Sequence, residues 1–307
     1  MTDTIFPPPG PGSAANRGGA DWRIDEQRAR AGGASAIPSD ALEIVDETTS
    51  TNTDLMARMK ALPRERAAVG VHAVRAAYSQ TAGRGRQGRS WQATPGHALT
   101  FSLACVLPRP LAGLAGLSLA TGVAVIDALA RLAPSEAGRL ALKWPNDVLL
   151  DGRKLAGILI ETAWSTANAS AAVIGVGINV RRDEALEAQL EAAAAGVPAQ
   201  ARATPPAALS QAVPEANLTD TLAVVVKALT EMTERFGAQG FAPFVGRWNA
   251  CHAYANQEVV LIDKGVEFAR GIATGVDSSG QLLLSTDAGM QAIATGDVSL
   301  RLADGAP

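Results

Sequence analysis

Hydrophobic and polar positions divide the chain into three stretches. Over residues 1–40, small, polar and turn-forming residues predominate without regular apolar spacing, so the pattern predicts a loosely ordered tail. Residues 41–254 mix strand-like and helical patterns, which predicts one large domain. Over residues 255–307 the pattern changes to five short strands separated by glycine-containing turns, which predicts a small C-terminal β-barrel.

Two long helices and a hairpin are expected within the large domain. The apolar stretch Leu111–Ala130 is long enough to span a bilayer, but it is mostly Ala, Gly, Ser and Thr and contains Asp127, so we interpret it as a core helix. Glycine accepts the positive φ of a tight turn, so Asp151-Gly152 predicts a two-residue hairpin turn. A short strand is expected after Ala41, followed by a helix after Ser50 with Leu55, Met56 and Met59 on one face. The remaining expected elements are helices over 183–195 and 218–236, and strands over 69–80, 97–107 and 170–180 and within 140–161.

Composition excludes several classes of protein. Lys and Arg total 27 against 30 Asp and Glu, and a net charge of -3 gives no general reason to expect binding to nucleic acid or membrane. A winged-helix DNA-binding domain needs roughly 60 residues with a core of its own, which the 1–40 tail cannot supply. The N-terminus lacks a basic and apolar leader, and Cys105 and Cys251 have no CxxC spacing. These features favour a cytoplasmic protein with reduced thiols.

A glycine-arginine loop lies between two expected strands. In Ala82–Trp91 (AGRGRQGRSW) three arginines alternate with three glycines, and Arg66–Ile126 contains six arginines but no Asp or Glu. Glycines let the backbone approach a ligand, and guanidinium groups match the oxygens of phosphates and carboxylates. The loop therefore predicts an anion site. An RNA-binding Arg-Gly segment and a plain solvated loop are alternatives, whereas neither a P-loop nor a dinucleotide-binding motif fits.

A lysine hairpin is the second informative feature. Lys143-Trp-Pro-Asn-Asp147 interrupts a strand with turn chemistry, and the hairpin that follows returns Lys154 beside that break. Two lysines and an Asn-Asp pair then surround one pocket. A surface hairpin with solvated charges remains an equal alternative from spacing alone.

Together these motifs closely resemble the biotin protein ligase family. GRGRQGRSW, KWPND, GRKLAGILIE, GVGINV (Gly175–Val180) and STN (Ser50–Asn52) match the family's motifs in order, and the resemblance covers about residues 43–303. It implies an α+β fold, with a mixed-sheet catalytic domain of the class II aminoacyl-tRNA synthetase and biotin ligase type followed by the small barrel. The form implied is one without an N-terminal DNA-binding domain.

The resemblance also implies roles for residues. Those expected to be catalytic are Lys154, Arg86, Lys143 and Asp147. Those expected to bind biotin are Ser50, Thr51, Asn52, Gln80, Gly83, Arg84, Trp91, Lys154, Gly157, Leu159, Gly175 and Gly177. Those expected to bind ATP are Arg86, Arg89, Trp144, Asn146, Lys154 and Asn179. For Ser50 and Thr51 a plain helix N-cap is the competing interpretation, and both functions are compatible.

The implied reaction explains the need for cations. Biotin carboxylate and the ATP α-phosphate repel each other unless fixed charge offsets them, which Arg84, Arg86, Lys143, Lys154 and Mg²⁺ would do. The ion is expected to be held mainly by ATP phosphates. Biotinoyl-AMP is then attacked by a carrier lysine, and Asp147 is placed to accept the lysine proton or to orient the amine. His72, His97 and His252 show no triad arrangement and are expected to be structural.

One departure and several alternatives accompany the resemblance. Relatives stack an aromatic side chain on adenine, but residues 181–216 contain none, so an aliphatic residue such as Leu209 or Val213 is the suggested cover. Lipoate ligases share the fold and the chemistry, a biotin-responsive repressor would need the missing winged helix, and a non-catalytic binding module would not need both cationic motifs. The implied partners are biotin and the biotin carboxyl carrier protein, with no nucleic acid or membrane, and family members can pair weakly through a sheet edge.

Overall fold

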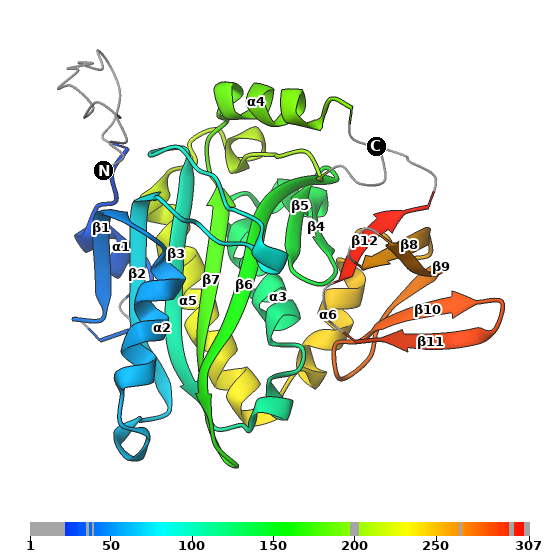
Figure 1. The fold of residues 1–307 in the computed structure, drawn as a ribbon. Coiled ribbons are helices and arrows are strands. Elements are labelled where there is room, and N and C mark those ends of the chain that lie inside the picture. The colour runs from blue at the N-terminus through cyan, green and yellow to red at the C-terminus, as the bar shows by residue number, and fades with distance from the viewer. Residues whose placement is uncertain are drawn as a thin grey trace, which may run out of the picture.

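Two β-sheets organise the chain in a computed structural model, which describes residues 22–34, 37–38, 40–196, 203–263, 266–294 and 298–303. A large mixed sheet with helices on both faces is followed by a smaller antiparallel sheet (Figure 1). The predicted α+β class is therefore confirmed.

The large sheet has seven strands in the order β1-β2-β3-β7-β6-β5-β4. Only β1 and β2 pair in parallel, and the other neighbours are antiparallel. All ten positions of β3 are buried, as expected for a central strand covered on both faces. The strands are β1 (Leu42–Thr48), β2 (Gly70–Gln80), β3 (Ala98–Leu107), β4 (Leu140–Lys143), β5 (Asp147–Leu150), β6 (Arg153–Ser165) and β7 (Ser170–Asn179).

Helices cover the two faces of this sheet. Helix α2 (Thr51–Ala61) packs Leu55 and Met59 against one face, as the periodicity predicted. Helices α3 (Leu117–Leu132) and α5 (Leu218–Gln239) contact each other and cover the opposite face (Figure 1). Among the described residues one stretch, Leu111–Leu132, is long and apolar enough to cross a membrane. Its α3 part lies in the protein core, which confirms the core-helix interpretation.

The predicted hairpin forms between β5 and β6. Asp151 and Gly152 have φ values of 49° and 75°, the left-handed conformation that such a turn requires. Lys154 returns beside the end of the 143–147 break, because Leu149 pairs with Lys154 across the hairpin.

The prediction of a loose tail up to residue 40 is wrong for residues 22–34, whereas residues 1–21 lie outside the described part. Asp25 caps the short helix α1 (Glu26–Ala31), which packs on α5 and buries Ala29 completely. The Trp22 ring meets the Tyr78 ring edge-on at 5.1 Å. Isolated apolar residues without periodicity gave no sign of this docking, because their contacts are more than 50 residues away in sequence.

The C-terminal part forms a barrel-like antiparallel sheet in the order β11-β10-β9-β8-β12, as predicted. Its strands are β8 (Glu258–Asp263), β9 (Val266–Val276), β10 (Leu282–Thr286), β11 (Gly289–Ile293) and β12 (Val298–Leu302). Helix α6 (Val245–Ala250) links the two sheets, and buried Trp144 donates a hydrogen bond from Nε1 to Gly280 O at 3.2 Å. The two parts thus share a buried seam.

His252 lies in this seam, and its burial predicts an acid-sensitive stability. The ring packs on Trp248 at 4.7 Å, and neither nitrogen has a hydrogen-bond partner among the described residues. Burial lowers the pKa of His252 to about 4. The unfolded state therefore binds a proton between about pH 6.5 and 4 that the folded state does not, so this contribution to stability is full above that window and falls with pH.

We expect urea unfolding at pH 5 to give a free energy about 2 kcal/mol below that at pH 7 from this group. In His252→Phe, which keeps a ring against Trp248, the loss should shrink by that amount. An equal loss in both proteins would show that other groups cause the acid sensitivity.

Candidate active site

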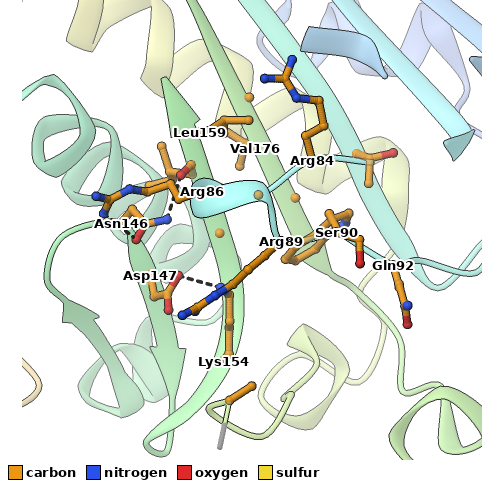
Figure 2. A pocket seen from close by; sticks show the side chains of 18 of the residues that line it. Arg84, Arg86, Arg89, Ser90, Gln92, Asn146, Asp147, Lys154, Leu159 and Val176 are labelled. Atoms are coloured by element: carbon orange, nitrogen blue, oxygen red, sulfur yellow. Dashed lines mark hydrogen bonds and ion pairs between the residues drawn. The ribbon is translucent and has the colours of Figure 1, made fainter. Parts of the chain in front are cut away.

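A pocket of about 330 Å³ lies where the large sheet, the cationic loop and β12 meet. Segments far apart in the sequence supply its walls (Figure 2). Every predicted site residue except Gly83 lines it, namely Ser50, Thr51, Asn52, Gln80, Arg84, Arg86, Arg89, Trp91, Lys143, Trp144, Asn146, Asp147, Lys154, Gly157, Leu159, Gly175, Gly177 and Asn179.

Positive charge dominates the pocket wall. Its only carboxylate among the described residues is Asp147, against six cations: Arg84, Arg86, Arg89, Lys143, Lys154 and Arg301. Lys154 Nζ pairs with Asp147 Oδ1 at 2.7 Å, and Arg86 Nη1 donates to Asn146 Oδ1 at 3.4 Å (Figure 2). The prediction that cations from separate segments converge on one cleft is confirmed.

Lys143 is the most deeply buried of these cations. Only 4% of the residue is exposed, and Nζ donates to Thr204 Oγ1 at 2.7 Å. Burial first, and then the charge of Arg301, lower the pKa of Lys143 to about 7. This ammonium is thus poorly compensated without an anion, as expected for a group that meets phosphate.

Arg84 does not join this group. Its side chain turns away from Asp147 and Lys154 (Figure 2), and Nη2 donates to Glu161 Oε1 at 2.7 Å. Glu161 thus pairs with the charge that Arg84 was expected to offer to carboxylate and phosphate, and that role stays a prediction. The loop supplies its other cations from the short turn Arg86–Gly88 and from Arg89.

A hydrogen-bonded cluster forms the end of the pocket at the start of α2. Gln80 Oε1 accepts from Thr51 N at 2.9 Å, and Thr51 Oγ1 lies 2.7 Å from Ser102 Oγ. Ser50 occupies the N-cap position, but its side chain makes no capping hydrogen bond. The N-cap interpretation thus fails for the Ser50 side chain, whereas Thr51 uses its hydroxyl within the pocket wall.

Glycines on β6 and β7 let side chains lie directly on the sheet. A Cβ at Gly175 would lie 2.4 Å from Asn52 Oδ1, and one at Gly177 would lie 2.4 Å from the Trp91 ring. The Trp91 Nε1–H is buried without a hydrogen-bond partner among the described residues. A donor left unsatisfied beside a pocket is suited to a polar ligand.

Gly83 acts from behind the pocket wall. Its carbonyl accepts from Trp91 N at 3.0 Å, and a Cβ here would lie 2.4 Å from the Trp91 carbonyl oxygen. The glycine is needed because two backbone segments approach each other closely. Gly83 thus shapes the loop, and its predicted contact with biotin stays a prediction.

Two of the residues predicted to bind ATP, Trp144 and Asn179, make hydrogen bonds within the fold. Trp144 is 1% exposed, and its indole N–H is used on Gly280. Asn179 Nδ2 donates to Lys154 O at 3.2 Å and to Ala207 O at 3.0 Å, which fixes the connection after β7 beside the hairpin. A ligand can therefore contact only those atoms of the two side chains that these hydrogen bonds leave accessible.

Other pocket residues were missed by the sequence analysis. Leu209 is 1% exposed in the core, and neither it nor Val213 lines the pocket, so the suggested adenine cover is wrong. Helix α4 (Glu184–Ala194) instead brings aliphatic side chains there. Additional lining residues include Ser102, Leu186, Leu190, Thr204 and Arg301. Helical periodicity in 183–195 could have flagged the two leucines, whereas nothing local marks Arg301.

The site offers electrostatics rather than a nucleophile or a metal cage. No histidine is among the lining residues. No group of three or more His, Cys, Asp or Glu in the described part of the chain could hold a metal ion. The arrangement is suited to bringing two anions together and stabilising charge that moves between them.

Family models match both parts of the chain. Residues 46–179 match the model described as the biotin/lipoate A/B protein ligase family, and residues 254–301 match the biotin protein ligase C terminal domain. The second match begins at residue 254, where the sequence predicts the change from the large domain to the small barrel.

Known proteins are similar over most of the chain. The bifunctional ligase/repressor BirA of Escherichia coli (strain K12) is 34% identical over 89% of this chain and 76% of its own length. The biotin--[acetyl-CoA-carboxylase] ligase of Paracoccus denitrificans is 37% identical over 72% of this chain and 88% of its own. The structure of the Aquifex aeolicus biotin protein ligase with biotin and ATP aligns with a TM-score of 0.64 at 26% identity, covering 85% of this chain and 99% of that one.

Proposed function

Because this chain belongs to the biotin protein ligase family, its reaction is the ATP-dependent attachment of biotin to protein, and we propose how the pocket residues carry it out. In the first step a biotin carboxylate oxygen attacks the α-phosphorus of ATP, the bond to the β-phosphate breaks, and pyrophosphate leaves. In the second step the ε-amine of a carrier lysine attacks the acyl carbon, loses a proton and displaces AMP.

Arg86, Lys143 and Lys154 are the groups assigned to the first step. They lie around one pocket on three separate segments, so they can face the carboxylate and the phosphates from different sides. Lys154 is held by Asp147, and Lys143 by Thr204, so both ammonium groups are oriented before substrate arrives. Preorganised charge of this kind lowers the barrier without reorganisation during the reaction. Arg89 is assigned to the ATP side.

The biotin ring is assigned to the cluster at the start of α2, and the biotin tail to the glycine strands. Thr51, Asn52 and Gln80 form a polar, nearly dry end that suits a ureido group. Gly157, Gly175, Gly177 and Leu159 line the pocket, and the Trp91 ring, which lies on Gly177, completes the wall proposed for the tail. Ser50 completes this end.

Asp147 and the carrier belong to the second step. We assign Asp147 to accept the amine proton or to orient the amine, because it is the carboxylate of the described pocket wall and lies beside Lys154. The carrier assigned is the biotin carboxyl carrier protein, since a relative is named for acetyl-CoA-carboxylase. Cytoplasmic action is proposed with it, in keeping with two unpaired cysteines.

Mg²⁺ is proposed to enter with the nucleotide. The pocket wall offers it one carboxylate among the described residues, which fits an ion held mainly by ATP phosphates rather than by a protein cage. Bound there, it would add to the positive charge that offsets the phosphates.

Leu186 and Leu190 are proposed as the apolar cover of adenine. Both line the pocket from α4, and Leu190 is 38% exposed. We expect Leu190→Ala to raise the KM for ATP about 10-fold at nearly unchanged kcat, since it removes apolar area buried by the base. Steady-state pyrophosphate release measures this. Leu111→Ala is the control, because Leu111 is 59% exposed and does not line the pocket, and equal effects in both variants would contradict the assignment.

A weak homodimer is also proposed, through β1. The other sheet edge, β4, is covered because Leu142 N donates to Cys251 O and Ala253 N donates to Leu142 O. Strand β1 pairs only with β2 among the described residues, so its outer edge can accept a second copy.

The convergence of Arg86 and Lys154 on one pocket is the observation that carries the proposal. The decisive experiment incubates the chain with Mg-ATP and either biotin or lipoate and measures pyrophosphate. Of the two acids, only biotin should support pyrophosphate release. Mass spectrometry of an added carrier protein should then show one biotinylated lysine. Release with lipoate instead would identify the chain as a lipoate ligase.

A further inference from the structure

Glu161, on β6, connects the cationic loop to the start of α2 although it does not line the pocket. Its two carboxylate oxygens divide between two partners. Oε1 accepts from Arg84 Nη2 at 2.7 Å, and Oε2 accepts from Asn52 Nδ2 at 2.9 Å. The side chain is 20% exposed, and hydrogen bonds to an ionised, largely buried carboxylate are stronger than neutral ones.

The carboxylate, the closer of the two acceptors of Asn52 Nδ2 (the other is the Leu159 carbonyl at 3.4 Å), also fixes the orientation of Asn52. An ionised carboxylate can only accept hydrogen bonds, so the Asn52 amide must present Nδ2 to Glu161. Its Oδ1 then faces the fully buried Ser102 and accepts from Ser102 Oγ at 2.6 Å. Asn52 itself is 3% exposed, so it has no water to compensate for the opposite orientation.

The orientation of Asn52 also determines the hydrogen-bond directions of Ser102 and Thr51. The Ser102 proton is used on Asn52, so Ser102 Oγ can only accept from Thr51 Oγ1 at 2.7 Å. The single Thr51 hydroxyl proton is then used as well. Thr51 Oγ1 is left with a lone pair, which makes it an acceptor for a ligand N–H.

We propose that Glu161 is a positioning residue for biotin. It fixes the hydrogen-bond directions around the ureido ring and, by holding Arg84, anchors the start of the cationic loop to the sheet. The inference rests on the proposed function, because the ligand whose N–H groups meet Thr51 is the biotin ring.

Glu161→Gln tests this, because it keeps the shape but removes the charge and allows the amide to donate. We expect the KM and Kd for biotin to rise about 10- to 100-fold, the effect of weakening charged hydrogen bonds, while kcat at saturating biotin stays within about threefold. Pyrophosphate release and calorimetric biotin titration give these values. Asp127→Asn, which removes the charge from the 2.7 Å pair with Arg247 outside the pocket wall, should leave both constants unchanged.

A swap of partners gives a second test that does not depend on the stability of the single variant. Asn52→Asp alone sets two carboxylates against each other. In the double variant Asn52→Asp/Glu161→Gln, the amide introduced at 161 can donate to the carboxylate introduced at 52, which still accepts from Ser102. The double variant should bind biotin more tightly than Asn52→Asp alone.

The inference is overturned by an unchanged biotin KM in a folded Glu161→Gln protein, by a fall in kcat at unchanged KM, or by no rescue in the swap. Its failure is separate from failure of the proposed function. If wild-type protein releases no pyrophosphate with biotin, the function is wrong. If wild-type protein is active and the variants behave like it, only the role of Glu161 is wrong.

Discussion

Lys154→Ala should slow pyrophosphate release at saturating biotin and ATP by about 100- to 1000-fold, the usual loss when one preorganised charge partner is removed. The side chain is 30% exposed, lies 2.7 Å from Asp147 and has its Nζ 6.0 Å from the Trp91 ring centre. Its removal takes away the ion-pair partner of the Asp147 carboxylate, which would then face the incoming phosphates. The pocket wall thus loses one positive charge, and its carboxylate loses an ion-pair partner.

The control for this prediction is Lys60→Ala, an exposed lysine on α2 outside the pocket. Both variants lose one ammonium group, so a general effect of net charge would slow both. If Lys154→Ala releases pyrophosphate at nearly the wild-type rate, Lys154 is only a solvated hairpin residue, as spacing alone allowed.

Gly83→Ala should weaken biotin binding about 100-fold or more, because misplacing a binding group by about 1 Å commonly has an effect of this size. The new methyl group would lie 2.4 Å from the Trp91 carbonyl oxygen, and no side-chain rotation relieves a contact between two backbone segments. The loop must open there, which displaces both Arg84 and Trp91 from their places on the sheet. Calorimetric titration with biotin measures the loss.

Gly85→Ala is the matched control in the same loop. Its added Cβ would lie 3.4 Å from Arg89 O, an ordinary contact, and its φ of -114° suits any residue. A loss in Gly85→Ala as large as that in Gly83→Ala would mean that loop flexibility, rather than the close approach at Gly83, controls binding.

Local sequence was sufficient to predict features that depend on near neighbours. The Asp151-Gly152 turn, the return of Lys154 and the burial of Leu117–Leu132 all follow from periodicity and turn chemistry within about 20 residues. The family resemblance then named site residues that, apart from Gly83, all line the pocket.

Features that depend on distant contacts could not be predicted. Arg84 was assigned to the anions because its sequence context is cationic, but its nearest charge is Glu161, 77 residues away. Arg301 reaches the pocket only because β12 packs against the large domain. The Trp22 ring contacts Tyr78 edge-on, and the absence of a side chain at Gly96 leaves room for it. None of these contacts leaves a periodic or motif signal.

The seam between the two sheets also determines the pKa of Lys143. Its depressed pKa arises first from burial and next from Arg301, and both depend on the C-terminal sheet staying seated, with Trp144 hydrogen-bonded to Gly280. Separation of the sheets would admit water to the ammonium group and remove its nearest positive neighbour. Any change that separates the two sheets would therefore raise the proton affinity of Lys143, so the packing of the C-terminal sheet and the protonation of this pocket lysine are coupled.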